Sequence, residues 1–215
     1  MIKFKLADGH LLHVLSCDAI LFDMDGTLID STVCVEATWR NWAARHNLDI
    51  EKLLQVAHGR QNHETIGLIA PHLNTPEEID SLVRAEEECR EGIVAVTGAR
   101  GLLEMLPHDR WAVVTSAWRK LAEIRLQFAG LPLPAVLITS DEVKRSKPNP
   151  DGYLEAAARL GLEPGDCLVF EDAPAGIEAG LAAGMKVVGV TTTFPRERLG
   201  CEWCIDDFRS LTLIR

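Results

Sequence analysis

Short apolar runs rich in β-branched residues recur along the second half of the chain, and amphipathic stretches separate them. The runs that predict strands lie at 111–114, 135–138, 167–170 and 187–190. The stretches that predict helices lie near 118–129, 150–161 and 174–183. Strands that alternate with helices in this way are typical of a parallel α/β sheet, which binds ligands at the carboxyl ends of its strands.

An earlier apolar run at 19–22 predicts one more buried strand, which ends at the polar segment 23–27. From Val33 to about Ala95 the pattern is mostly helical instead. Apolar residues there recur at three- and four-residue spacing, as at Val35, Trp39, Trp42 and Ala43. This block therefore predicts a helical insertion after the first strand.

Inside this helical block, Pro76 opens a Glu-rich helix that is expected to run to about Glu91, with Thr75 as its N-cap. At the other end of the chain, residues 4–6 and 11–14 flank Asp8-Gly9, a favoured tight-turn dipeptide, and predict a small hairpin. The hairpin is either an added edge of the fold or an extension that precedes it. It carries no evident chemistry.

The composition is that of an ordinary globular protein, with 215 residues, 47% hydrophobic and 25% charged. The net charge of −10 repels phosphate backbones and anionic lipids, which argues against nucleic-acid and membrane partners. No apolar run approaches the roughly 18 residues of a membrane span, and the first residues lack a signal-peptide pattern. We therefore expect a cytoplasmic, monomeric enzyme.

The chain contains six cysteines, at positions 17, 34, 89, 167, 201 and 204. Cys201 and Cys204 have the CxxC spacing, but no second pair completes a set of four zinc ligands. Reduced thiols in a reducing compartment are the expected state.

Two carboxylates follow the strand at 19–22, Asp23 and Asp25. Side chains two residues apart on extended backbone point the same way, so these two share one site. Their mutual repulsion requires a cation or a shared proton. Such a pair suits Mg²⁺ beside a phosphate, with one carboxylate attacking and the other handling protons.

Three further strand ends carry groups that phosphoryl transfer needs, which are Ser116, Lys147 and the pair Glu171-Asp172. Each has an ordinary alternative when taken alone. Ser116 could cap a helix, Lys147 could be a solvated surface charge, and the acidic pair could cap the helix that follows it. At the exits of separate buried strands, the set together favours a catalytic site.

These residues fall into four motifs in the order found in the haloacid dehalogenase superfamily, which the chain resembles from about Cys17 to its C-terminal region. The motifs stand here as Asp23-Met24-Asp25-Gly26-Thr27, Val113-Val114-Thr115-Ser116, Ser146-Lys147-Pro148 and Glu171-Asp172 followed by Gly176. Within the superfamily the chain resembles the β-phosphoglucomutase-like subgroup, and in particular sugar and polyol phosphatases. That resemblance implies a Rossmann-like α/β core of residues 1–31 and 96–215, and a helical C1-type cap of residues 32–95.

The resemblance also implies a role for each motif residue. Asp23 would attack phosphorus and form an aspartyl-phosphate, while Asp25 would protonate the leaving oxygen and later activate water. Ser116 and the backbone N–H of Ala117 would bind the transferring phosphate, and Lys147 would pair with phosphate and nucleophile. Thr27 is expected to orient Asp25 through its hydroxyl.

A magnesium ion is the implied cofactor. Its ligands would be Asp23, the backbone carbonyl of Asp25 and Asp172, with Glu171 as a second acid at the same strand end. Asp172 is the more direct ligand of the two adjacent acids.

The motifs also separate the reactions known in this superfamily. Asp25 argues against a dehalogenase, because a halide leaving group needs no proton. Phosphonatases carry a cap lysine that has no obvious counterpart here. Sugar-phosphate mutases carry a histidine where this chain has Val35, which favours hydrolysis and leaves the mutase as the alternative. A non-catalytic phosphometabolite-binding protein would not need both Asp23 and Asp25.

A polar loop interrupts the helical cap at His58-Gly59-Arg60-Gln61-Asn62-His63. It resembles the substrate-specificity loop of phosphatases that act on glycerol, hexitol and deoxysugar phosphates. Arg60 could bind a phosphate or hydroxyls, and His58, Asn62 and His63 could bind a polyol. Asn62 could instead cap a helix, the histidines could be packing or surface residues, and Trp118 could line the pocket or pack under the cap. The sequence thus predicts a Mg²⁺-dependent phosphatase for small sugar or sugar-alcohol phosphates.

Overall fold

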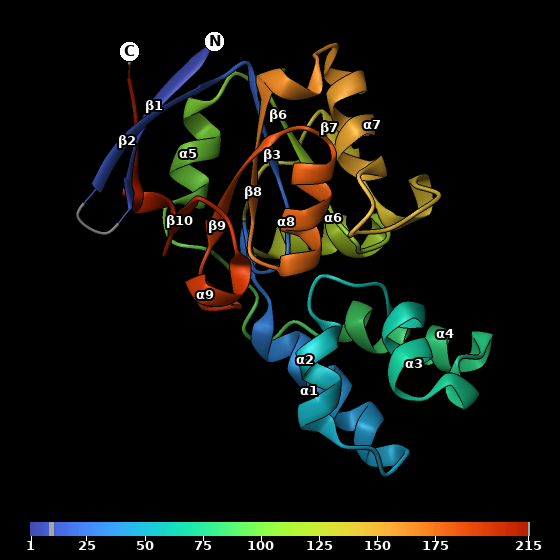
Figure 1. Cartoon of the computed structure of the whole chain (residues 1–215). Coiled ribbons are helices and arrows are strands. Elements are labelled where there is room, and N and C mark those ends of the chain that lie inside the picture. The colour runs from blue at the N-terminus through green and yellow to red at the C-terminus, as the bar shows by residue number, and fades with distance from the viewer. Residues whose placement is uncertain (9–10, 215) are drawn as a thin grey trace.

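The computed structural model describes residues 1–8 and 11–214. Its centre is a six-stranded sheet in the order β10-β9-β8-β3-β6-β7, in which every neighbouring pair is parallel (Figure 1). The strands are β3 (Ala19–Phe22), β6 (Trp111–Val114), β7 (Val136–Ile138), β8 (Cys167–Glu171), β9 (Lys186–Val190) and β10 (Trp203–Ile205). The parallel α/β sheet expected from the sequence is therefore confirmed.

Helices cover both faces of this sheet because side chains on each strand alternate between the faces. Ile20 and Phe22 of β3 pack in one hydrophobic cluster with residues of α5 and α6, whereas Ala19 and Leu21 pack in another with residues of α7 and α8. The helices are α5 (Ala99–Met105), α6 (Arg119–Phe128), α7 (Asp151–Leu160), α8 (Pro174–Ala182) and α9 (Arg196–Leu199). Single 3₁₀ turns lie at η2 (Ser140–Glu142), η3 (Pro164–Asp166) and η4 (Phe208–Ser210).

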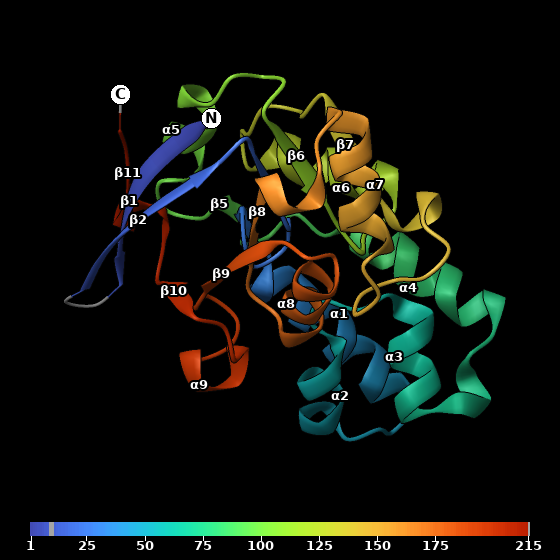
Figure 2. The ribbon, with the colours of Figure 1, turned by 45° about the horizontal axis from the view of Figure 1, so that its top comes forward.

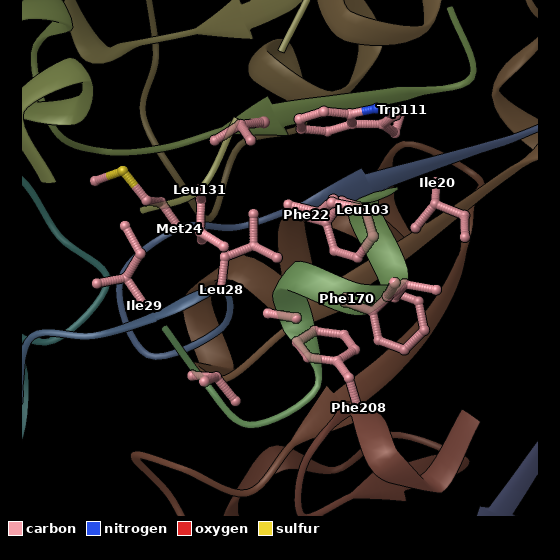
Figure 3. Packing of buried hydrophobic residues seen from close by; sticks show 14 of the residues in the cluster. Ile20, Phe22, Met24, Leu28, Ile29, Leu103, Trp111, Leu131, Phe170 and Phe208 are labelled. Atoms are coloured by element: carbon pink, nitrogen blue, oxygen red, sulfur yellow. The ribbon is translucent and has the colours of Figure 1, made fainter. Parts of the chain in front are cut away.

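Aromatic rings fill the first of these clusters (Figure 3). The rings of Phe22 and Phe170 stack with centroids 5.5 Å apart, and Phe208 meets Phe170 edge-on at 5.4 Å. Because Phe22 and Phe170 immediately precede the polar segments at the ends of β3 and β8, this packing holds both strand ends in place.

Four helices of the predicted insertion, α1 to α4, pack around a hydrophobic cluster of their own that includes Trp39, Trp42 and Leu53. They are α1 (Thr32–Arg45), α2 (Ile50–Ala57), α3 (Asn62–Ile69) and α4 (Pro76–Glu88), with a 3₁₀ turn, η1 (Pro71–Leu73), between the last two. Figures 1 and 2 show them grouped on one side of the molecule. Thr75 caps α4, as expected, by accepting a hydrogen bond from the backbone N–H of Glu78. The helix ends three residues before Glu91, because Cys89 is extended.

The chain leaves and re-enters the α/β part through a two-stranded antiparallel ribbon, β4 (Ile29–Asp30) and β5 (Val94–Ala95). The predicted boundary at 31/32 lies one residue beyond β4 and that at 95/96 directly after β5, and the division into two domains stays a prediction. Next to the ribbon, Cys34 and Cys89 are joined as a disulfide with Cα atoms 5.8 Å apart, a separation that suits a disulfide. This pairing differs from the reduced thiols expected from the sequence, because the fold brings together two cysteines that are 55 residues apart in sequence.

The N-terminal strands β1 (Ile2–Asp8) and β2 (Leu11–Cys17) pair antiparallel, as the hairpin prediction requires. The Asp8-Gly9 turn itself lies outside the described residues. Strand β11 (Leu211–Leu213) joins β1 from the other end of the chain, so that the three strands form a separate sheet rather than an edge of the main one. Phe4 and Leu6 are buried in the core, which makes the hairpin part of the fold. Among the described residues, no helix is long and apolar enough to cross a membrane.

Candidate active site

Four charged residues meet at the carboxyl end of the central strands. Asp23 follows β3, Glu171 and Asp172 lie at the end of β8, and Lys147 comes from the loop before α7. Lys147 Nζ lies 2.5 Å from Asp23 Oδ1, 2.7 Å from Glu171 Oε1 and 3.0 Å from the carbonyl oxygen of Val114 at the end of β6. All four side chains are buried. The structure therefore brings together residues that are up to 149 positions apart in sequence, since 172 − 23 = 149.

The turn after β3 brings these groups close together. Three backbone N–H groups, of Thr27, Leu28 and Ile29, point toward the carbonyl oxygen of Met24 and close a tight loop. Gly26 adopts a φ of +90°, in the left-handed region that side chains other than glycine rarely occupy. A Cβ at this position would also collide with the carboxylate of Asp172. Glycine at position 26 therefore lets the loop approach the end of β8.

The three carboxylates of Asp23, Glu171 and Asp172 form a cluster that can hold a metal ion. One oxygen from each lies within 4.8 Å of the others, and all three residues are buried. Burial raises the pKa of Asp23 to about 7, although Lys147 opposes this rise. Burial and the charges of Asp23 and Glu171 raise the pKa of Asp172 well above its ordinary value. One ammonium does not neutralise three buried carboxylates, so a divalent cation fits this site.

The two acids at the end of β8 differ in how many hydrogen bonds their carboxylates accept. Glu171 accepts hydrogen bonds from Lys147 Nζ and Tyr153 Oη at 2.7 and 3.0 Å, and from the backbone N–H groups of Asp172 and Ala173 at 3.0 and 3.1 Å. Asp172 accepts from Thr27 Oγ1 at 3.2 Å and from the side chain of Thr193. Asp172 therefore has more free lone pairs for a metal. No motif in the sequence points to Tyr153 as a partner of Glu171.

Asp25 lies apart from this cluster, at the edge of a cavity, with its side chain 24% exposed. Ser31 Oγ donates to its Oδ1 at 2.7 Å, and Arg125 Nη1 lies 2.7 Å from its Oδ2. The expectation that Thr27 orients Asp25 is wrong, because the tight loop points the Thr27 hydroxyl at Asp172. The sequence signal for Arg125 is a charged residue within the apolar stripe of α6.

The predicted phosphate-binding residues follow β6. Ser116 Oγ donates a hydrogen bond to the carbonyl oxygen of Gly59 in the cap loop at 3.0 Å. The backbone N–H of Ala117 donates to Thr115 Oγ1 at 3.1 Å. Both predicted donors thus lie beside the cavity, and in this structure both have protein partners.

A cavity of about 210 Å³ separates the helical insertion from the α/β part. Its lining includes Asp23, Asp25 and Ser116 from the α/β part and, from the cap loop, His58, Arg60, Asn62 and His63. Burial lowers the pKa of His58. Trp118 lines the same cavity and donates from Nε1 to Glu87 of α4 at 3.1 Å, so it both faces the pocket and packs against the insertion.

The cap-loop side chains predicted to bind substrate make bonds within the insertion. Arg60 Nη1 donates to the carbonyl oxygen of Val56 at 3.0 Å, and Asn62 Nδ2 donates to Glu86 Oε2 at 2.8 Å. Asn62 is the first residue of α3, and Gln61 is its N-cap, so the alternative of Asn62 as N-cap is wrong.

The effect of burial on the pKa of Glu86 can be tested through the pH dependence of protein stability. Burial raises its pKa, although Arg125 and the hydrogen bond from Asn62 oppose the rise. In the unfolded chain the pKa of a Glu is about 4.3, so the folded protein keeps its proton on Glu86 to a higher pH than the unfolded chain does. The wild type therefore loses stability as the pH rises from the unfolded-state pKa through the folded-state pKa. Glu86→Gln keeps an acceptor for Asn62 and removes this dependence. We expect urea unfolding between pH 4.5 and 7.5 to show the variant gaining stability relative to wild type as pH rises.

Glu77→Gln, on an exposed position of the same helix, is the matched control and should follow wild type. Parallel stability curves for wild type and Glu86→Gln would contradict the prediction.

Comparison with known proteins agrees with the site. The family model for haloacid dehalogenase-like hydrolases matches residues 20–190, and the chain belongs to that family. It is 44% identical over 190 residues to hexitol phosphatase A of Escherichia coli (strain K12), covering 85% of this chain and 87% of the relative. It is 36% identical to glycerol-1-phosphate phosphohydrolase 2 of Saccharomyces cerevisiae, covering 92% and 85%. Among solved structures, a hydrolase from Pseudomonas syringae superposes with a TM-score of 0.79 at 27% identity, covering 89% and 94%.

Proposed function

We propose that this protein is a Mg²⁺-dependent phosphatase that hydrolyses small sugar or sugar-alcohol phosphates through an aspartyl-phosphate on Asp23. The observation that carries this proposal is the contact of Lys147 with Asp23 beside two further buried carboxylates, with Asp25 two residues away at the cavity. Membership of the haloacid dehalogenase-like family supports it, as do relatives named as phosphatases.

The nucleophile of the proposed reaction is Asp23. Lys147 donates to Asp23 Oδ1, which favours the charged form of the carboxylate and opposes the rise of its pKa. Asp23, Asp172 and the backbone carbonyl of Asp25 would hold a Mg²⁺ ion, which would supply positive charge to the phosphate oxygens. Ser116 and the backbone N–H of Ala117 donate to the same oxygens once they exchange their present partners.

Proton transfer is assigned to Asp25. Its carboxylate faces the cavity and is held by Ser31 and Arg125, so its orientation is fixed while its exposed edge stays accessible. It gives a proton to the leaving alkoxide and then takes one from the water that attacks the phosphoenzyme. Both steps need a carboxyl group close to, but separate from, the nucleophile.

The size and lining of the cavity support a small polar substrate. A volume of about 210 Å³ lies below the roughly 300–1,000 Å³ typical of drug-sized ligand sites. Its lining offers donors and acceptors that suit hydroxyl groups, from His58, Arg60, Asn62 and His63. The substrates named for the relatives, a hexitol phosphate and glycerol 1-phosphate, belong to this class. The cytoplasmic location and the monomeric state expected from the sequence stay proposals.

Released phosphate from a panel of hexitol, glycerol and hexose phosphates tests the function, with and without EDTA. We expect phosphate release that EDTA abolishes and added Mg²⁺ restores. Asp172→Asn should raise the half-saturating Mg²⁺ concentration by roughly 10-fold or more, since even residues that only support metal ligands change affinity by about 10–100-fold. Release that persists undiminished in EDTA would contradict the metal requirement. Conversion of a hexose 1-phosphate to the 6-phosphate without free phosphate would establish the mutase alternative.

A further inference from the structure

The guanidinium of Arg125 is buried beside the cavity in a position that its helix alone does not explain. Arg125 lies on α6 next to Leu126 and three residues after Ala122, and both of these are fully buried. Its side chain is 3% exposed and lines the same cavity as Asp25. A charged group on the apolar face of a helix is costly unless its N–H groups are bonded.

The bonding of this guanidinium is incomplete. Nη1 lies 2.7 Å from Asp25 Oδ2, whereas Nη2 lies 3.8 Å from Glu86 Oε1, which is beyond hydrogen-bond distance. Within residues 1–8 and 11–214, Nε and Nη2 have no hydrogen-bond partner although both are buried. The other oxygen of Glu86 accepts from Asn62 at 2.8 Å. Arg125 therefore has free, buried N–H groups next to the proposed acid–base residue.

We propose that Arg125 determines specificity by donating hydrogen bonds to the hydroxyl on the carbon next to the phosphate-bearing carbon of the substrate. The inference rests on the proposed function. In that reaction Asp25 contacts the ester oxygen, and Arg125 Nη1 contacts Asp25. Two hydrogen-bond lengths, each about 2.7–2.9 Å, thus join the ester oxygen to Nη1, and the free N–H groups lie on the same guanidinium. The hydroxyl on the adjoining carbon is the next polar group of such a substrate, and we place it against these N–H groups.

A hydroxyl suits these donors better than the phosphate does. The phosphate has to lie at Asp23 and Lys147, whereas Arg125 contacts Asp25, and the charge of Arg125 is already paired there. A hydroxyl adds acceptor lone pairs without adding a second negative charge. Sites built to bond a substrate hydroxyl discriminate strongly against an analogue that lacks it, because the buried donors are then left unpaired.

Two substrate pairs test the inference, each differing by that hydroxyl alone. They are glycerol 1-phosphate with 3-hydroxypropyl phosphate, and a hexitol 6-phosphate with its 5-deoxy analogue. We expect wild type to prefer the hydroxylated member by roughly 10²-fold or more in kcat/KM, since sites that hydrogen-bond a substrate hydroxyl reject the analogue that lacks it by up to about 10⁴–10⁵-fold. Arg125→Met should lower kcat/KM for both members through its contact with Asp25, but should shrink the ratio to within about 3-fold. Arg125→Lys, with fewer donors, should give an intermediate ratio.

Arg100→Met is the matched control, because Arg100 lies on α5, outside the residues that line the cavity, and donates to the carbonyl oxygen of Ala129. The Arg100→Met variant should keep the wild-type ratio of kcat/KM between the two members of each substrate pair. A wild-type enzyme that hydrolyses both members equally well would overturn the inference, as would an Arg125→Lys or Arg125→Met variant that loses activity on both members by the same factor. Absence of phosphate release by wild type from every compound would instead overturn the proposed function.

Discussion

Asp23→Asn should abolish turnover, with kcat reduced on the order of 10⁴-fold or more on every phosphate monoester that the wild type hydrolyses. The amide keeps the shape of the side chain and an oxygen for Lys147, but it cannot attack phosphorus. The covalent phosphoenzyme should vanish with the activity, which acid-quenched mass spectrometry of the protein during turnover measures directly. The fold should persist, because the change removes one charge from a crowded group of buried carboxylates.

Asp80→Asn is the matched control, since Asp80 is an exposed residue of α4. It should retain wild-type activity and phosphoenzyme. An Asp23→Asn protein with near-normal kcat would remove Asp23 from the mechanism, and a phosphoenzyme peptide that maps elsewhere would reassign the nucleophile.

Lys147→Met should cost both stability and activity. Removing one partner of a buried charge cluster typically destabilises a protein by about 3–5 kcal/mol, and here Asp23 and Glu171 both lose their contact. Loss of a positive group aimed at the reacting phosphate should lower kcat by roughly 10²–10³-fold. Urea unfolding in EDTA at pH 8 measures the first effect, and phosphate release at saturating Mg²⁺ measures the second.

The stability cost should shrink at lower pH. Burial raises the pKa of Asp23 to about 7 even with Lys147 in place, so without the ammonium this carboxyl takes up a proton more readily. Protonation removes one of the unpaired charges. The difference in the free energy of unfolding between Lys147→Met and wild type should therefore become smaller as the pH is lowered from 8 to 5.5. Lys144→Met, at an exposed position in the same loop, should behave as wild type. A Lys147→Met protein as stable as wild type at pH 8 would contradict the assigned contacts.

Most strands of the main sheet could be predicted closely because each is mainly a buried apolar run, whereas β10 (Trp203–Ile205) was not predicted. The expected strand at 111–114 coincides with β6, and that at 167–170 falls short of β8 by one residue. The two-residue strands β4 and β5 could not be predicted, because a pattern of two residues carries no periodicity. The pairing of β11 with β1 was equally inaccessible, since it joins opposite ends of the chain.

The candidate site could be predicted only in part, because a sequence pattern places residues on strands but does not say which side chains contact each other. Asp23 and Asp172 were accessible because each follows a predicted strand, and parallel strands bring their carboxyl ends to one edge. Lys147, in the loop between β7 and α7, was accessible through the motif that it belongs to. Side-chain partners are not encoded in that pattern. The hydroxyl of Thr27 bonds Asp172 rather than Asp25, and Arg125 reaches Asp25 from a helix that carries none of the motifs.

The hydrogen bond from Ser116 Oγ to the carbonyl oxygen of Gly59 has a consequence for how the enzyme empties its site. A serine hydroxyl has a single proton, which it can give to one acceptor at a time. In the proposed reaction, phosphate and the backbone of the 58–63 loop would compete for the same donor. When product phosphate leaves, the Ser116 hydroxyl would donate to Gly59 again, and re-formation of this bond would favour release of inorganic phosphate and weaken inhibition by product.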